Sequence, residues 1–167
     1  MDDTTPDDMY VDSKFIKPCT SQLALEVGEN LRRDDAREVE ATMGLYAPVA
    51  VLQSYYHAAY GSTVYFHDAH GKAAGVAGVT KENIIWMLCT DVIETKPHTF
   101  VREAKRWLDS LPNPYLYNHA DMRNEVHIKL LKFLGFKFIE YHVYNGVPLI
   151  YFIKVKPCAI QQAPQLA

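Results

Sequence analysis

Hydrophobic residues recur along this chain with two periods, one typical of helices and one of strands. Helical spacing marks several segments, and short apolar runs bounded by glycine, asparagine, aspartate or proline mark strands between them. The expected helices begin at about Ser21, Asp35 and Pro48 and cover Phe100–Leu111 and Asn124–Leu134. The expected strands are Ser13–Lys17, Thr63–His67, Lys72–Thr80, Ile84–Thr90, Tyr115–His119, Lys137–Tyr144 and Val147–Val155. This order predicts a mixed α/β (α+β) fold with a central, mostly antiparallel sheet of about six or seven strands flanked by helices.

Local signals sharpen the expected ends and faces of two helices. Asp35 followed by Glu38 has the spacing of a capping box, so the second helix is expected to open at Asp35. Pro48 suits the first turn of the third helix. The residues of the third helix that share a face, and that we expect to point inward, are Val49, Leu52, Tyr56 and Ala59.

The last third of the chain carries the clearest turn signals. Gly135 can adopt the left-handed conformation that ends a helix and lets the chain reverse into a strand. Asn145-Gly146 between two strand patterns predicts a type I′ β-hairpin. The helix before Gly135 places four apolar residues on one face, namely Val126, Leu130, Phe133 and Leu134.

Composition and charge indicate one soluble globular domain. The chain has 167 residues, is 49% hydrophobic and carries a net charge of −3, which gives no electrostatic attraction for nucleic acid or an anionic membrane. No apolar run approaches a membrane span, and the opening residues lack the order of a signal peptide. We expect a single domain over residues 11–156, a flexible acidic segment over 1–10 and a flexible tail over 157–167, with both ends able to order on a partner.

Cysteine and histidine patterns do not favour a metal centre. The 3 cysteines lack CxxC spacing and are expected to be reduced thiols, Cys19, Cys89 and Cys158. His67 and His70, with Asp68 between them, could bind a metal, but Asp and Gly at this point are explained more simply by a β-turn. We therefore expect no metal site.

Several of these segments together resemble a known enzyme fold. Asn124–Phe136, preceded by the strand Tyr115–His119, resembles the carboxy-terminal half of the GNAT N-acetyltransferase fold. Ile84–Thr90 and Phe100–Leu111 lie where that fold has its central strand and its cofactor helix. Leu31–Gly44 resembles the second helix of small GNAT-like proteins of tailed bacteriophages, the internal virion or core-assembly protein A family.

The resemblance implies a site for acetyl-CoA but the chain departs from the family's motif there. GNAT enzymes hold acetyl-CoA between two splayed strands, with its pyrophosphate on backbone N–H groups at the start of the next helix. The corresponding stretch, Glu94–Thr99, lacks the motif's glycines, and Pro97 has no N–H to donate. Lys96 and His98 are the phosphate partners that could compensate. If the pocket is open, the resemblance implies further coenzyme contacts at Cys89, Thr90 and Asn124.

The proton-handling residues implied by the resemblance also differ. Many GNAT enzymes have a tyrosine acid four residues before the Gly-Phe pair, where this chain has Leu131, and the alanine usual after the family's asparagine is His127. A general base is expected near the central strand. The candidates are His119, which titrates near neutrality, and Asp91.

Two functional hypotheses follow from these departures. The first is a non-catalytic or weakly catalytic phage GNAT-like protein, acting in virion or internal-core assembly or binding a host protein, in the host cytoplasm or inside the virion. The alternative is an active acetyl-CoA-dependent N-acetyltransferase that modifies an amine on a host protein or small molecule. Acetyl-CoA is thus a candidate cofactor in only one of them. In the first, an exposed aromatic patch near Tyr55–Tyr60 is the expected protein anchor.

Overall fold

The computed structural model describes residues 13–157, so the expectations for residues 1–10 and for the tail from residue 158 lie outside the described residues. Within this range the elements alternate much as the pattern predicts. In chain order they are β1 (Ile16–Pro18), α1 (Ser21–Glu29), α2 (Arg33–Met43), α3 (Ala47–His57), β2 (Val64–His67), β3 (Ala73–Val79), β4 (Ile85–Cys89), α4 (Val92–Thr95), α5 (Pro97–Ser110), β5 (Tyr115–Asp121), α6 (Glu125–Phe133), β6 (Lys137–Tyr144) and β7 (Val147–Val155).

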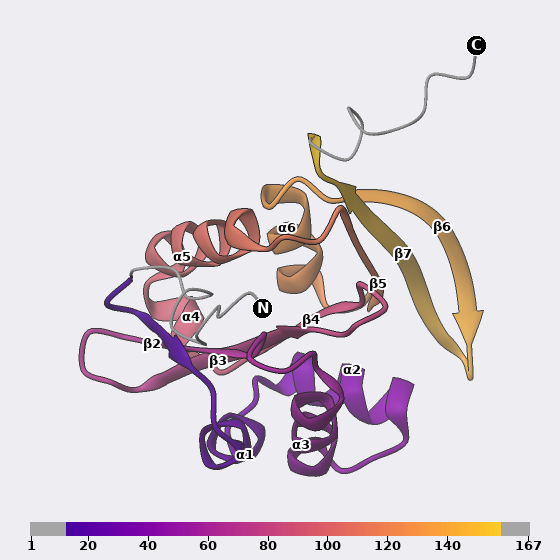
Figure 1. The fold of residues 1–167 in the computed structure, drawn as a ribbon. Helices are drawn as coiled ribbons and strands as arrows, with labels where there is room; N and C mark the ends of the chain where they lie inside the picture. Colours follow the sequence, from indigo (N-terminus) through magenta and orange to yellow (C-terminus); the bar gives the residue numbers. More distant parts are fainter. Residues whose placement is uncertain (1–12, 158–167) are drawn as a thin grey trace.

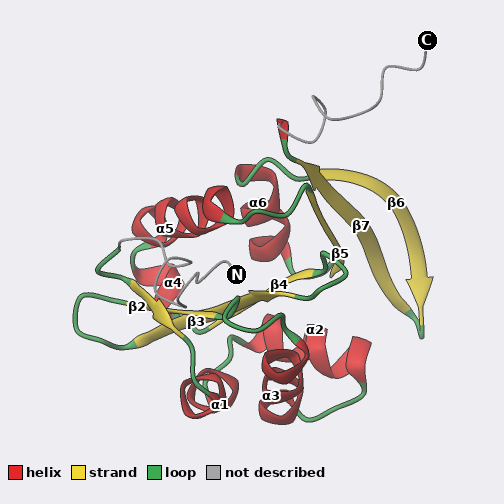
Figure 2. Cartoon of the chain, in the orientation of Figure 1, coloured by secondary structure: helices red, strands yellow, loops and turns green. Residues whose placement is uncertain are grey.

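The strands form two antiparallel sheets that diverge from a common point (Figure 2). One sheet has four strands in the order β1-β2-β3-β4, and the other has three in the order β5-β7-β6. The sheets meet where Ile84 forms a parallel bridge with Tyr117 and where the Asn118 amide donates to the carbonyl of Ile85 at 2.8 Å. β4 and β5 do not pair beyond this point, so a gap opens between their carboxyl ends.

Helices cover both faces of the sheet system (Figure 1). α1, α2 and α3 lie on one face of the four-stranded sheet, with a core that includes Ala24, Val27, Val51, Tyr65 and Val76. α5 and α6 lie on the opposite side, with a core that includes Phe66, Trp107, Leu108, Leu116 and Phe152. All seven residues of β3 are buried because helices pack on both of its faces. The predicted fold class is confirmed.

The hairpin and the expected helices are present, but the predicted start of α2 is wrong. Asn145 and Gly146 both have positive φ, 47° and 77°, as a type I′ turn between β6 and β7 requires. α2 begins at Arg33, before Asp35, and neither Asp35 nor Glu38 caps it. Both carboxylates are buried instead and bond to residues far along the chain.

The predicted inward face of α3 is wrong at Val49 and Tyr56, whereas Leu52 is partly buried and packs against the core as expected. The buried residues of α3 are Ala47, Pro48, Ala50 and Val51, whereas Val49 and Tyr56 are exposed. The reason is close packing against α1, because a Cβ added at Gly28 would lie 2.8 Å from the Cα of Pro48. Only small side chains fit that contact, so Val49 and Tyr56 are left on the exposed side of α3.

The predicted stripe of α6 divides between two environments. Leu134 is buried, together with Leu131, against β7 and α5. Val126 and Phe133 are exposed, Phe133 by 79%, and with Leu130 they form an apolar surface beside α5. Part of the apolar stripe of α6 is therefore open to solvent.

Gly28→Ala tests the α1–α3 contact, because helix propensity and packing predict opposite signs for the change in unfolding free energy. In an open helix the change would stabilise the protein by about 0.5–1 kcal/mol. Against the backbone of Pro48 we expect destabilisation by about 1–3 kcal/mol, measured by urea unfolding. Gln22→Ala, at an exposed position of α1, is the control and should change stability little. A more stable Gly28→Ala protein would refute the packing argument.

Candidate functional site

Two carboxylates of α2 bridge the gap between β4 and β5. Asp35 Oδ2 accepts a hydrogen bond from the backbone N–H of Cys89 at 2.8 Å, at the end of β4. Glu38 Oε1 accepts from the backbone N–H of Asp121 at 3.1 Å, at the end of β5. The two acids are three positions apart, so both lie on one face of the helix. The helix thereby joins the diverging ends of the two sheets.

The side chain of Asn124 completes this bridge from the side of α6. Its amide nitrogen donates to Asp35 Oδ1 at 2.8 Å and to Glu38 Oε2 at 2.9 Å. Its amide oxygen accepts from the backbone N–H of His127 at 3.3 Å and so caps α6. Asn124 is fully buried, and all of its side-chain polar atoms are used inside the protein.

The segment before α2 covers the open edge of β4. Thr90 N–H donates to Ala74 in β3, so the N–H and C=O of the preceding Cys89 point away from β3, toward the gap. The Cys89 carbonyl accepts from the backbone N–H of Arg32 at 2.9 Å, and Leu31 forms an antiparallel bridge with Thr90. Both backbone groups of Cys89 are therefore bonded within the chain.

Arg32 extends the cover toward α4. Its guanidinium pairs with Asp35 at 3.0 Å and with Glu94 at 3.2 Å, and the arginine itself is buried. Burial raises the pKa of the Asp35 carboxyl, an effect that the charges of His127 and Arg32 only partly oppose. A buried carboxylate of this kind depends on its partners, because an unpaired charge in the interior is costly.

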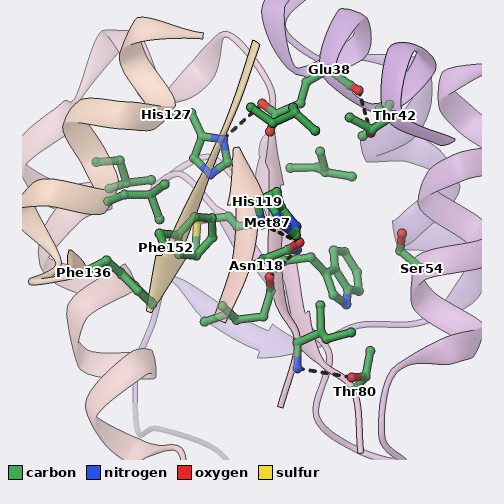
Figure 3. Close-up of a pocket in the computed structure, with 18 of the residues that line it drawn as sticks. Glu38, Thr42, Ser54, Thr80, Met87, Asn118, His119, His127, Phe136 and Phe152 are labelled. Carbon is green, nitrogen blue, oxygen red and sulfur yellow. Dashed lines mark hydrogen bonds and ion pairs between the residues drawn. The ribbon is translucent and has the colours of Figure 1, made fainter. Parts of the chain in front are cut away.

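His127 and Glu38 form an ion pair that faces a cavity (Figure 3). Nδ1 of His127 lies 3.1 Å from Glu38 Oε2, and since a carboxylate can only accept, Nδ1 is the donor. Burial acts to lower the pKa of His127, but the charge and hydrogen bond of Glu38 more than offset it and the pKa is raised. Burial acts to raise the pKa of Glu38, and His127 and the other donors hold it below its usual value.

The larger cavity has a volume of about 500 Å³ and passes through the gap between the sheets. On one side its lining includes Thr42 of α2 and Ser54 of α3, and on the other it includes Trp107 of α5 and Leu131 of α6. The walls are mostly apolar. Its volume lies within the range of small-molecule sites.

A second cavity of about 360 Å³ lies between α4, α5 and α6. Its lining is mostly apolar and includes Ile93, Phe100, Val126 and Phe133, and Arg32 and Glu94 also line it. Three residues line both cavities, namely Met87, His127 and Leu130. The Glu38–His127 pair thus lies where the two spaces approach each other.

Solved structures with the same arrangement are acetyltransferases. A GNAT acetyltransferase from Bacillus anthracis superimposes with a TM-score of 0.60 at 10% identity, over 84% of this chain and 93% of that one. One from Streptococcus pneumoniae gives 0.57 at 17% identity, over 84% and 97%. A chimera of the spermidine N-acetyltransferase SpeG from Vibrio cholerae with hSSAT gives 0.58 at 12% identity, over 88% and 98%.

The chain has the GNAT acetyltransferase fold. No protein-family model matches its sequence, and no curated protein matches it either. In the frame of the GNAT fold, β4 corresponds to the central strand, α5 corresponds to the long helix that comes after it, and the gap bridged by Asp35 and Glu38 corresponds to the gap between the splayed strands.

The two residues predicted as general bases, His119 and Asp91, lie in different parts of the structure. His119 is exposed on β5, lines the larger cavity, and has its ring 4.9 Å from those of His142 and Tyr151. Partial burial, with the neighbouring His142, lowers the pKa of His119. Asp91 is exposed at the start of α4 and lines neither of the two large cavities.

The residues predicted to contact a coenzyme either lie outside the two large cavities or are already bonded or buried within the protein. Lys96 and His98 are exposed and line neither large cavity. Thr90 donates its hydroxyl to the carbonyl of Ala73. Cys89 lines the second cavity, but burial raises its pKa well above the ordinary thiol value, so it is held as the thiol.

Other candidate sites are accounted for by local structure. Asp68 accepts from the backbone N–H groups of His70 and Lys72 at 2.9 and 2.8 Å, which explains this aspartate as a turn residue. Across residues 13–157, no three His, Cys, Asp or Glu side chains are grouped to hold a metal ion. In the same range, no helix has the length and apolar character to cross a membrane.

Replacement of Asp35 tests the bridge across the gap. Asp35→Ala leaves the N–H of Cys89 and the charge of Arg32 without their buried partner, so we expect a loss of about 3–5 kcal/mol in unfolding free energy. Asp34→Ala is the matched control, since Asp34 pairs with Arg37 in a half-exposed bridge worth under about 1 kcal/mol. Equal unfolding midpoints for the two variants would show that the bridge does not hold the sheets.

Proposed function

We propose that this protein uses the GNAT fold to bind another protein and does not transfer acetyl groups from coenzyme A in the way of the enzymes it resembles. The proposal rests on the hydrogen bonds made by the backbone N–H and C=O of Cys89. Its N–H and C=O face the gap in which GNAT enzymes hold acetyl-CoA, and Asp35 and Arg32 already bond both. A coenzyme arm lying along this edge would have to displace the chain's own hydrogen bonds.

The start of the cofactor helix supports the same proposal. α5 begins at Pro97, which offers no N–H to a phosphate. None of the three residues directly before Pro97 is a glycine. Glu94 lines the neighbouring cavity, where it pairs with Arg32 and places negative charge close to the expected pyrophosphate position. Leu131, at the position of the family's tyrosine acid, is buried in the core and cannot donate a proton.

Calorimetric titration with acetyl-CoA tests the absence of coenzyme binding. Because each missing amide contact is worth about 0.5–1.5 kcal/mol and each 1.4 kcal/mol is tenfold in affinity, we expect a Kd weaker than about 100 μM. The intact protein, with its unfolding transition measured in the same buffer, is used throughout. Low-micromolar binding would contradict the proposal and favour an enzyme.

We further propose that the bound partner is a component of a tailed-phage particle or of its assembly pathway. The resemblance of Leu31–Gly44 and of Phe100–Phe136 to phage internal virion proteins supports this partner. An aromatic surface around α3 supports binding, since Tyr56 and Tyr60 are exposed by 70% and 90%. Exposed tyrosines are frequent anchors of protein interfaces because they bury a large area at low entropic cost.

Mass spectrometry of purified particles and of complexes from infected cells tests this partner. We expect the chain in the particles, and we expect Tyr56→Ser/Tyr60→Ser to reduce its incorporation by about tenfold or more. Tyr141→Ser, at an exposed tyrosine of β6, is the control. Absence of the chain from particles and stable complexes, or undiminished incorporation of the double variant, would contradict the proposal.

A second candidate is an N-acetyltransferase acting on an amine of a host protein or small molecule. The observation that favours it is the approach of the two cavities at Met87, His127 and Leu130, where an acyl donor and an amine from opposite faces could meet. His119, which lines the larger cavity, would then be the base, and His119→Ala would lower turnover with little change in coenzyme affinity.

A further inference from the structure

The larger cavity has the size and the mostly apolar lining of a site for a small apolar molecule. Its walls come from α2 and α3 on one face and from α5 and α6 on the other, so it runs through the gap between β4 and β5. Most of its lining is aliphatic or aromatic, including Leu88, Leu108 and Phe152. An unbranched chain fits a passage between two strands better than a compact ligand does.

The polar groups of this cavity favour an acceptor over a cation. Glu38 accepts from Asp121 through one oxygen and from Asn124 and His127 through the other, so it has little capacity left for an ammonium group. Nδ1 of His127 bonds to Glu38, and its second ring nitrogen, Nε2, has no hydrogen-bond partner among residues 13–157. His127 is 17% exposed, and its ring is turned toward the cavity (Figure 3).

From this arrangement we infer that the cavity binds a straight-chain carboxylic acid, with the acyl chain in the apolar passage and the carboxylate on Nε2 of His127. The Glu38–His127 pair supplies the proton that makes Nε2 a donor, because the carboxylate stabilises the imidazolium form. A charge-assisted hydrogen bond of this kind is stronger than one between neutral groups. The inference does not rest on the proposed protein partner.

The chain carries its own reporter for this binding. It has 2 tryptophans, and both Trp86 and Trp107 line the cavity. Titration of the full chain with hexanoate, octanoate and decanoate should change the tryptophan fluorescence in a saturable way. Each added methylene buried in the passage should tighten Kd by about fourfold, from the usual transfer free energy of a methylene group.

A comparison of ligand head groups, together with variants of the cavity, tests whether the carboxylate of the ligand lies at His127. Decylamine should bind at least about tenfold more weakly than decanoate, because it offers no acceptor to His127. His127→Phe should abolish that preference. Met87→Trp should block the passage and weaken decanoate at least tenfold, and Met122→Trp, at an exposed methionine outside the lining, is the matched control.

The outcomes that would overturn the inference are specific. They are no saturable signal with decanoate by fluorescence or calorimetry, equal affinity for decylamine, or unchanged decanoate affinity in Met87→Trp. Met87→Trp leaves Glu38 and His127 in place, so it decides the matter even if His127→Phe does not fold. Binding of decanoate together with failure of acetyl-CoA to bind would separate this site from coenzyme recognition.

Discussion

The buried hydrogen bonds of Asp35 and Glu38 are the interaction on which the rest of this structure depends. β4 and β5 belong to different sheets, and each ends with a backbone N–H that the other strand cannot satisfy. A buried N–H without a partner costs about 1–3 kcal/mol, and the two carboxylates of α2 remove that cost at Cys89 and Asp121. The carboxylates in turn require Arg32, Asn124 and His127, since a buried charge is stable only when it is paired.

This constraint connects fold and function. In the GNAT frame, the gap between the splayed strands is where a coenzyme enters, and here the amino end of α2 fills its β4 side with protein groups. The neighbouring surface between α5 and α6 is mostly apolar, with Val126 and Phe133 exposed; of the basic residues that line it, Arg32 and His127 are already paired with acids and Lys129 is exposed. A pyrophosphate gains little from such a surface. Apolar chains and protein partners are better matched to the spaces that this arrangement leaves open.

Local sequence signals predicted the order of elements well, and long-range contacts explain where they failed. Asn145-Gly146 identifies its hairpin because the turn requires two positive φ values, which is a property of those residues alone. Asp35 and Glu38 have the spacing of a capping box, but the same spacing puts two acids on one face of a helix, and apart from Arg32 their partners lie 54 to 89 residues away. Likewise, the buried face of α3 was set by Gly28 on another helix. The acids were visible in the sequence, whereas their burial was not.

The most direct measurement is amide hydrogen exchange at Cys89 and Asp121, followed residue by residue by NMR. If the carboxylates of α2 occupy the gap, both amides should exchange as slowly as the core amides of β3, and Asp35→Ala should speed exchange at Cys89 more than at Val76. Fast exchange at Cys89 in the unmodified protein, close to that of an exposed loop amide, would mean that the edge of β4 is open, and it would contradict the account.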